Sequence, residues 1–269
     1  MATVKNVFQV SGSIGEYTIY TRKGTDKAIM RLKGGPNGDK MANSPTFKEV
    51  RKHQTEFSGC TKFAAKTRIA FGDLFKLANY NLNSKLTGIG KTLMKLDETT
   101  EAGKRSLKLS QYKQILEGFN FNNTPGFSSM LLAIPRWELD RENLQAVVYI
   151  PEINTDIDVN NIHNLPFFRL IIAIGTVSDS VYNPKTENYE PMVVELNGAS
   201  VTVTGEWNSS HTILPKSTMS VQMHESRREL LTENVTVLLS MGVEFANTGF
   251  DSKPVAVKYS GSGKVIAVS

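Results

Sequence analysis

The stretch of sequence that comes nearest to a catalytic motif is Gly-Ile-Gly-Lys-Thr at residues 88–92. Gly-Lys-Thr ends the phosphate-binding loop of many nucleotide-binding proteins, in which a lysine and backbone N–H groups hold the phosphates. That loop also needs a glycine where this chain has Lys85, and a strand before it, which the sequence does not predict. We therefore expect residues 88–92 to lie in a helix or at a helix corner, with the Lys91 side chain in solvent.

Residues that could bind a metal ion or act as nucleophiles show no stronger pattern. No two of the four histidines are spaced to share one helix face or adjacent same-face strand positions. No serine stands in the Gly-x-Ser-x-Gly sequence of a hydrolase. The single cysteine, Cys60, excludes an intrachain disulfide, and we expect it to be a buried thiol. The histidines are His53, His163, His211 and His224.

Oxygen-bearing side chains at residues 156–161 could supply ligands for calcium. An EF-hand loop would need a glycine at its sixth position and a glutamate at its twelfth, where this chain has Asn161 and Phe167. We expect a turn held by side-chain hydrogen bonds instead. Because no motif predicts catalysis, we expect no enzymatic activity, no metal, no cofactor and no small-molecule substrate. The oxygen-bearing residues are Asp156, Asp158, Asn160 and Asn161.

Charge divides the chain into two halves. Residues 1–118 hold 21 Lys and Arg against 10 Asp and Glu, a net charge of +11, whereas residues 119–269 hold 10 against 16, a net charge of −6. This asymmetry favours either a basic face for a polyanion or a positive surface on one copy that meets a negative surface on the next. With 40% hydrophobic residues over 269 positions, the chain can build a sizeable core.

Residues 7–33 have the pattern of an extended arm. Residues 17–20 are β-branched or aromatic and residues 28–33 alternate apolar and basic side chains, which is typical of strands. Residues 22–26 supply turn chemistry, so we expect a hairpin. A lone hairpin is marginal in water and needs a sheet or groove to join, in its own chain or in a neighbouring one. The expected contact residues are Phe8, Ile14, Tyr17, Ile19, Tyr20 and Met30, with Arg22, Arg31 and Lys33 supplying charge.

Helical patterns follow this arm. Residues 34–38 break regular structure, and Ser44 with Pro45 then provides an N-cap and a first helical residue. Apolar residues recur at helical spacing as far as about residue 96, with an interruption expected at residues 58–59. A further helix is expected over residues 106–117, ending at Gly118.

From residue 119 onward the sequence changes to short β-rich runs separated by turns. The spacing favours an antiparallel, immunoglobulin-like β-sandwich, with a short helix over residues 225–232. We therefore predict an α+β protein with a β arm and hinge (1–43), a basic helical segment (44–118) and a C-terminal β-sandwich (119–269). The expected strands are residues 127–134, 145–150, 167–177, 192–196, 200–204, 218–223, 235–245, 255–259 and 264–268.

The opening of the chain resembles that of a group of uncharacterised bacterial proteins. The resemblance covers about the first 75 residues. It implies that an extended, glycine-containing start followed by a basic helix is a recurring arrangement, and it implies no activity or functional residue. The positions that carry it are Gly12, Gly15, residues 17–20, Lys33, Gly34, Gly35, Pro45, Phe47, Arg51 and Phe57.

These features favour a non-enzymatic structural subunit that self-assembles into an oligomer, filament or tube by strand exchange and head-to-tail charge complementarity. The first alternative is a protein that binds nucleic acid through its basic half. The second is a ligand- or carbohydrate-binding β-sandwich that uses Trp137, Trp207 or Tyr189. The start of the chain lacks the apolar run of a signal peptide and no later stretch predicts a membrane span, so we expect synthesis in the cytoplasm and no membrane partner.

Overall fold

A computed structural model describes residues 2–4, 11–21, 28–36 and 38–269 of the chain. The chain divides into two compact units, which we call the N-terminal unit (Met1–Arg51) and the C-terminal unit (Lys52–Ser269) and describe separately. Within the described ranges, no helix is both long and apolar enough to cross a membrane.

The N-terminal unit contains a four-stranded antiparallel sheet, which we call the N-terminal sheet. β3 and β4 pair from Tyr17↔Leu32 to Thr21↔Ala28, which confirms the expected hairpin. Residues 22–27, which join the two strands, lie outside the described ranges. The strand order is β1 (Ala2–Val4), β4 (Ala28–Leu32), β3 (Tyr17–Thr21) and β2 (Gly12–Ile14).

Short helices lead from this sheet to the first long helix. α1 (Gly38–Asn43) and the 3₁₀ turn η1 (Pro45–Phe47) precede α2 (Lys48–Ala70). Ser44 is extended and Pro45 occupies the first helical position, as predicted. Arg51 Nη1 donates hydrogen bonds to the carbonyl oxygens of Met41 (2.8 Å) and Ser44 (2.9 Å), which fixes the chain entering α2.

The C-terminal unit is built around a six-stranded antiparallel sheet whose two central strands, β8 and β15, are buried on both faces. Ile172 and Ile174 of β8 point into one hydrophobic core, whereas Ile171 and Ala173 point into another. Burial on both faces explains why these strands read as continuous apolar runs. The strands are β11 (Ala199–Thr204), β8 (Phe167–Ser178), β15 (Val235–Thr248) and β16 (Pro254–Ala256), with β12 (Asn208–Ser209) on β8 and β17 (Ser262–Val268) on β15.

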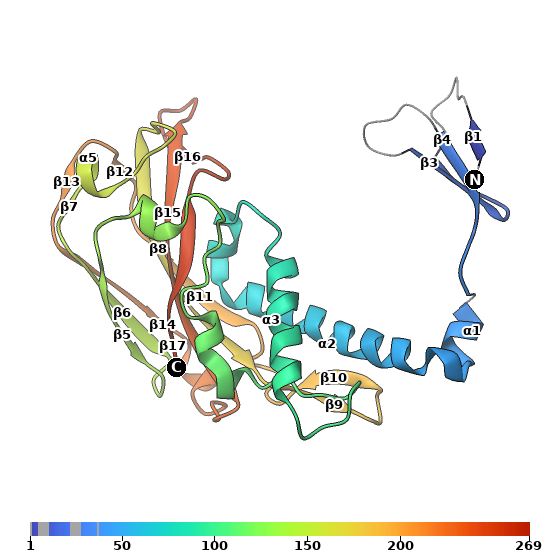
Figure 1. Ribbon diagram of the computed structural model, residues 1–269. Helices are drawn as coiled ribbons and strands as arrows, with labels where there is room; N and C mark the ends of the chain where they lie inside the picture. Colours follow the sequence, from blue (N-terminus) through green and yellow to red (C-terminus); the bar gives the residue numbers. More distant parts are fainter. Residues whose placement is uncertain (1, 5–10, 22–27, 37) are drawn as a thin grey trace. The chain divides into compact units, whose positions relative to one another are not determined.

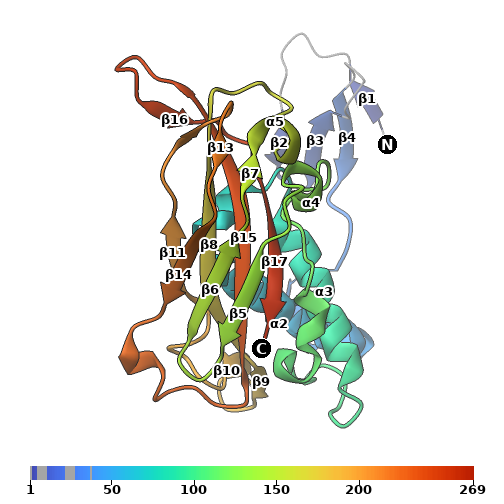
Figure 2. The same ribbon diagram turned by 90° about the vertical axis from the view of Figure 1, so that its left-hand side faces the viewer.

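A three-stranded sheet faces one side of the six-stranded sheet (Figure 2). Its middle strand contributes Ala146, Val148 and Ile150 to the core shared with Phe168 and Phe245 of the larger sheet. The alternation of buried and exposed residues along this strand fits a sheet with one face on the core and one in solvent. Its order is β14 (Ser217–Gln222), β6 (Gln145–Ile150) and β5 (Arg136–Asp140).

Helices cover the other side of the six-stranded sheet (Figure 1), so the unit has three layers. Phe63 and Leu93 from the two long helices share the second core with Leu238 and Val265 of the sheet. The Ala70 carbonyl, at the end of α2, lies directly against Gly175 of β8. Besides α2, the helical layer contains η2 (Gly72–Leu77), α3 (Leu82–Leu96) and η3 (Leu109–Leu116).

Smaller elements complete the unit. They include the hairpin of β9 (Ser180–Asn183) with β10 (Asn188–Pro191) and the short pair β7 (Ile153–Asn154) with β13 (Ile213–Leu214). The remaining helical turns are α4 (Phe127–Met130), α5 (Thr155–Asp158) and η4 (Glu225–Arg227).

The predicted α+β class is confirmed, with N-terminal strands and helices followed by antiparallel sheets, whereas the immunoglobulin-like sandwich is not. Residues 127–134 form α4 and an irregular segment instead of a strand, because a short apolar run suits either element. Residues 192–196 are also not a strand. The interruption expected at residues 58–59 is absent, because α2 continues through Gly59. A Cβ at Gly59 would lie 2.7 Å from the Tyr189 ring, so this glycine makes room for the ring.

Candidate functional site

One face of the N-terminal sheet is apolar. The registers Ile14↔Tyr17 and Tyr17↔Leu32 place these three side chains on one face of neighbouring strands. Ile14 is 64% exposed, Tyr17 43% and Leu32 57%. Ile19 and Met30 pair with each other on the same face and are half-buried. We call these five residues the apolar arm face; Leu32 was not among the expected contact residues, although the alternation over residues 28–33 carried the signal.

The other expected contact residues lie elsewhere. Tyr20 and Arg31 are on the opposite face of the sheet, where the Arg31 guanidinium lies 5.4 Å from the Tyr20 ring centroid. Lys33 is exposed beyond β4, and its N–H donates to the Glu16 carbonyl oxygen at 2.6 Å. The two remaining expected residues, Phe8 and Arg22, lie outside the described ranges.

The residues of the N-terminal sheet whose burial the structure describes are mostly exposed or half-buried. Among the residues of this unit whose burial the structure describes (11–21, 28–36 and 38–51), Ala28 alone is buried. A sheet becomes stable by packing one face on another layer, and a small sheet without such a layer is marginal in water. The apolar arm face is therefore a candidate contact surface.

The C-terminal unit has a largely apolar groove lined by residues of β5, of β17 and of the segment that precedes β5. Its cavity volume is about 520 Å³. Trp137 of β5, with Leu132 and Ile134 from the preceding segment, lines one side, and these side chains are 41%, 53% and 82% exposed. Val265 and Ile266 of β17 line the other side. We call this cavity the Trp137 groove.

β5 leaves one edge of its sheet unpaired. It pairs with β6 only, and within the described part of the chain no backbone hydrogen bond reaches its outer edge. Trp137 stands opposite the fully buried Val148, so it lies on the core-facing side of β5. A free strand edge beside an apolar groove is the arrangement that takes up an extended chain by strand addition.

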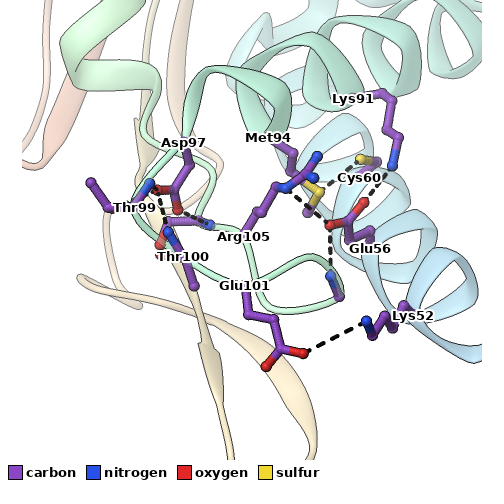
Figure 3. Close-up of polar contacts among 12 residues, drawn as sticks. Lys52, Glu56, Cys60, Lys91, Met94, Asp97, Thr99, Thr100, Glu101 and Arg105 are labelled. Carbon is purple, nitrogen blue, oxygen red and sulfur yellow. Dashed lines mark hydrogen bonds and ion pairs between the residues drawn. The ribbon is translucent and has the colours of Figure 1, made fainter. Parts of the chain in front are cut away.

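A buried carboxylate joins the helices of the C-terminal unit (Figure 3). Glu56 of α2 is 2% exposed and accepts hydrogen bonds from Lys91 Nζ of α3 and from the Gly103 N–H (2.8 Å). Arg105 Nε lies 3.7 Å from Glu56 Oε1. Burial acts to raise the pKa of Glu56, but the hydrogen bonds from Lys91 and Gly103 and the nearby positive charges lower it overall. Lys91 and Gly103 donate hydrogen bonds to the two oxygens of Glu56, so this carboxylate holds the helices together and is not available as a general base.

The loop after α3 is held in the same region (Figure 3). Asp97, the C-cap of α3, accepts backbone hydrogen bonds from Thr99 (3.1 Å), Thr100 (3.2 Å) and Ser106 (2.8 Å). Burial acts to raise the pKa of Asp97, but these bonds hold it well below the ordinary range. The carboxylate is thus committed to positioning the loop.

The motif at residues 88–92 lies inside α3, as expected, but the prediction that Lys91 is solvated is wrong, because its ammonium bonds Glu56. At Gly90 a Cβ would lie 3.1 Å from the Phe63 ring, so this glycine allows α2 and α3 to approach closely. Cys60 is buried, as predicted, with its Sγ 3.5 Å from Met94 Sδ; burial raises the pKa of the thiol to about 11.

The oxygen-rich stretch at residues 156–161 is held by side-chain hydrogen bonds, as predicted. Asp158 accepts from the Asn154 N–H at 2.9 Å, and the Asn161 side chain bonds both the N–H and the carbonyl of Leu165. His211 Nδ1 lies 2.9 Å from Asp156 Oδ1 at an exposed position. Over the described ranges, no three His, Cys, Asp or Glu side chains gather as a metal site would require.

The three aromatic residues considered for ligand binding occupy different environments. Trp137 lines the groove. The Arg169 guanidinium lies over the Trp207 ring, 4.2 Å from the ring centroid. Tyr189 is buried, with 4% of its surface exposed. Trp137 is therefore the one of these three whose side chain is exposed.

Comparison of the chain with protein-family models, with curated proteins and with solved structures finds no match.

The Glu56 anchor predicts a pH-dependent stability. Glu56→Gln is expected to lower the free energy of unfolding by about 1–3 kcal/mol at pH 7, because it removes a charged acceptor that is bonded in the folded state. Because folding lowers the pKa of Glu56, the ionised carboxylate stabilises the folded protein at pH values above its ordinary pKa of 4.5. This stabilisation is lost as the pH falls through the pKa of the folded state. The difference between the two proteins should therefore narrow in urea unfolding below about pH 4.5.

The matched control is Glu101→Gln, which removes the carboxylate from an exposed pair with Lys52 (3.6 Å). An exposed pair of this kind contributes about 0.5 kcal/mol or less. Equal effects of the two substitutions at pH 7 would contradict the assignment of Glu56 as a buried anchor.

Proposed function

We propose that this protein is a non-enzymatic structural subunit that self-assembles through its N-terminal sheet. The observation that supports this best is the apolar arm face, whose Ile14 and Leu32 are more than half exposed. Ala28 is the one buried residue among residues 11–21, 28–36 and 38–51. A contiguous exposed apolar face of this kind marks a contact surface. We also infer that the two facing sheets of the C-terminal unit form a β-sandwich.

Charge favours a second copy as the partner. Residues 1–51 contain 9 Lys and Arg against 4 Asp and Glu, a net charge of +5, whereas residues 119–269 carry −6. Opposite charges on the two parts of one chain favour a head-to-tail contact between copies, which extends into a filament unless its rotation closes a ring.

The test is the mass of the full chain in solution, measured by light scattering over a range of concentrations at low salt. The wild type is expected to form oligomers, and Ile14→Ser with Leu32→Ser is expected to dissociate them. Loss of two apolar contacts is worth about 3 kcal/mol, which is roughly a hundredfold weaker association. Electron microscopy of the wild type would then show whether the assembly is a ring or a filament.

Ile29→Ser is the matched control, because Ile29 lies next to Met30 on the opposite face of β4. It should assemble like the wild type. A wild-type chain that stays monomeric at high concentration and low salt would refute self-assembly.

Nucleic-acid binding remains the second candidate because of the opposite face of the N-terminal sheet. Tyr20 with Arg31 above its ring combines an aromatic surface and a cation, as in sites that bind single strands. This candidate requires an affinity for single-stranded DNA or RNA that falls steeply with salt and falls further in Arg31→Ala. Salt-independent or undetectable binding would leave self-assembly as the single proposal.

A further inference from the structure

Next to β5, apolar side chains on the core-facing side of the three-stranded sheet are exposed. The sheet ends at β5, and next to this edge Trp137, Leu132 and Ile134 remain 41–82% exposed while lining the groove. Residues 118–121 pair with the outer side of β17 over Gly263–Val265, so the edge of the larger sheet is covered there. The unsatisfied backbone edge at the groove is thus that of β5.

We propose that this open position is the receiving site for the N-terminal sheet of a second copy, with its edge strand β2 adding to β5. This inference rests on the proposed self-assembly and names the surface that the arm occupies. β2 is also the last strand of the N-terminal sheet, which runs β1-β4-β3-β2, and none of the described residues pairs with its outer edge. Pairing β2 with β5 would satisfy one free edge from each sheet and join them into a continuous sheet across two copies.

The two sheets match in the chemistry of their faces. Trp137 and Leu139 stand opposite the buried Val148 and Ala146, so they mark the core-facing side of β5. In a continuous sheet, alternate residues keep the same side on every strand. Placing Ile14 on the side of Trp137 therefore brings the whole apolar arm face over the groove, where it can meet Ile266.

The arm fits this position better than the tip of the β15–β16 hairpin, another protruding apolar element, does. The tip of the β15–β16 hairpin carries Phe250 fully exposed, held by a hydrogen bond from the Gly249 N–H to the Lys253 carbonyl oxygen (2.8 Å). That tip presents one aromatic side chain beside an Asp251–Lys253 ion pair and no net charge. The N-terminal sheet presents the five side chains of the apolar arm face and the outer edge of β2. The N-terminal unit (residues 1–51) carries a net charge of +5, and the half of the chain that contains the groove carries −6.

Association measurements test the groove. Trp137→Ser is expected to weaken assembly of the full chain at least tenfold in light scattering. Tyr149→Ser is the matched control, because Tyr149 is also 41% exposed but lies on the opposite face of the neighbouring strand β6. Tyr149→Ser should assemble like the wild type.

Cross-linking tests the strand pairing in trans. Ser13→Cys is placed in one copy and Glu138→Cys in another, both in a Cys60→Ala background, and the mixed proteins are treated with a short bismaleimide. Both positions are exposed and would lie on the outer face of the joined sheet. A covalent heterodimer that disappears in Trp137→Ser is expected. A chain carrying both cysteines that cross-links within itself at high dilution would overturn the proposal.

The outcomes separate the two proposals. If Ile14→Ser with Leu32→Ser dissociates the protein while Trp137→Ser does not, self-assembly stands and the receiving site is not the Trp137 groove. If the wild type does not associate at all, both proposals fail. If Trp137→Ser dissociates the protein and the Phe250→Ser variant assembles normally, the groove holds the arm and not the hairpin tip.

Discussion

Gly175→Ala is expected to lower the free energy of unfolding by at least about 3 kcal/mol. A Cβ at this position would lie 1.8 Å from the Ala70 carbonyl oxygen and 2.6 Å from its carbonyl carbon. Backbone atoms cannot rotate away, so either α2 must move off the sheet or β8 must bend out of its pairing with β11 and β15. Urea unfolding followed by circular dichroism would measure the loss.

Gly88→Ala is the control, since the same chemical change is made in α3, where a Cβ would meet nothing within 4 Å. Replacing a glycine inside a helix by alanine is expected to stabilise the protein by up to about 1 kcal/mol. The two substitutions should therefore shift the unfolding midpoint in opposite directions. A midpoint for Gly175→Ala equal to that of the wild type would mean that the end of α2 does not lie against β8.

β8, the strand that Ala70 contacts, was predicted from the sequence, but the layers that cover it were not. The strand expected over residues 167–177 is β8 (Phe167–Ser178), because twelve residues with almost no charge must be buried on both faces. The sequence could not indicate which layers bury them. The charge boundary near Gly118 suggested separate parts, yet the helices before it share a core with the sheet after it.

Edge strands and short helices were harder to predict for opposite reasons. β5 (Arg136–Asp140) was not expected, because three of its five residues are charged and an exposed edge strand tolerates charge. Residues 127–134 were expected to be a strand, but residues 127–130 form α4 and the rest is irregular. Both errors fall around the Trp137 groove, so the candidate receiving site was not predictable, although Trp137 itself was considered for a different function.

Glu56 left a signal that could have been found. It occupies the same helical stripe as Cys60, Phe63 and Thr67, all buried, so its spacing places a carboxylate on the core-facing side of α2. Its partners come from residues 91, 103 and 105, and only the folded chain brings them together. Spacing therefore predicts that Glu56 is buried but cannot predict what neutralises it.

Lys91→Met is expected to lower the free energy of unfolding by about 3 kcal/mol at pH 7, the lower end of the range for breaking a buried ion pair. The substitution removes the ammonium and leaves the Glu56 carboxylate buried, with the Gly103 N–H as its donor and Arg105 at 3.7 Å. The Lys91 side chain is 36% exposed, so its own burial contributes little to this cost. Thermal and urea unfolding of the two proteins would measure the difference.

The double variant Lys91→Met with Glu56→Gln decides whether the cost comes from the stranded charge. Glutamine keeps an oxygen for the Gly103 N–H without a charge, so the double variant should be more stable than Lys91→Met alone. In Lys91→Met, burial should raise the pKa of Glu56, so stability is retained at low pH and lost as the pH rises through that pKa. The deficit relative to the wild type should therefore shrink at pH 4. A deficit that is independent of pH, together with a double variant less stable than either single one, would mean that Lys91 stabilises α3 by packing and not by neutralising Glu56.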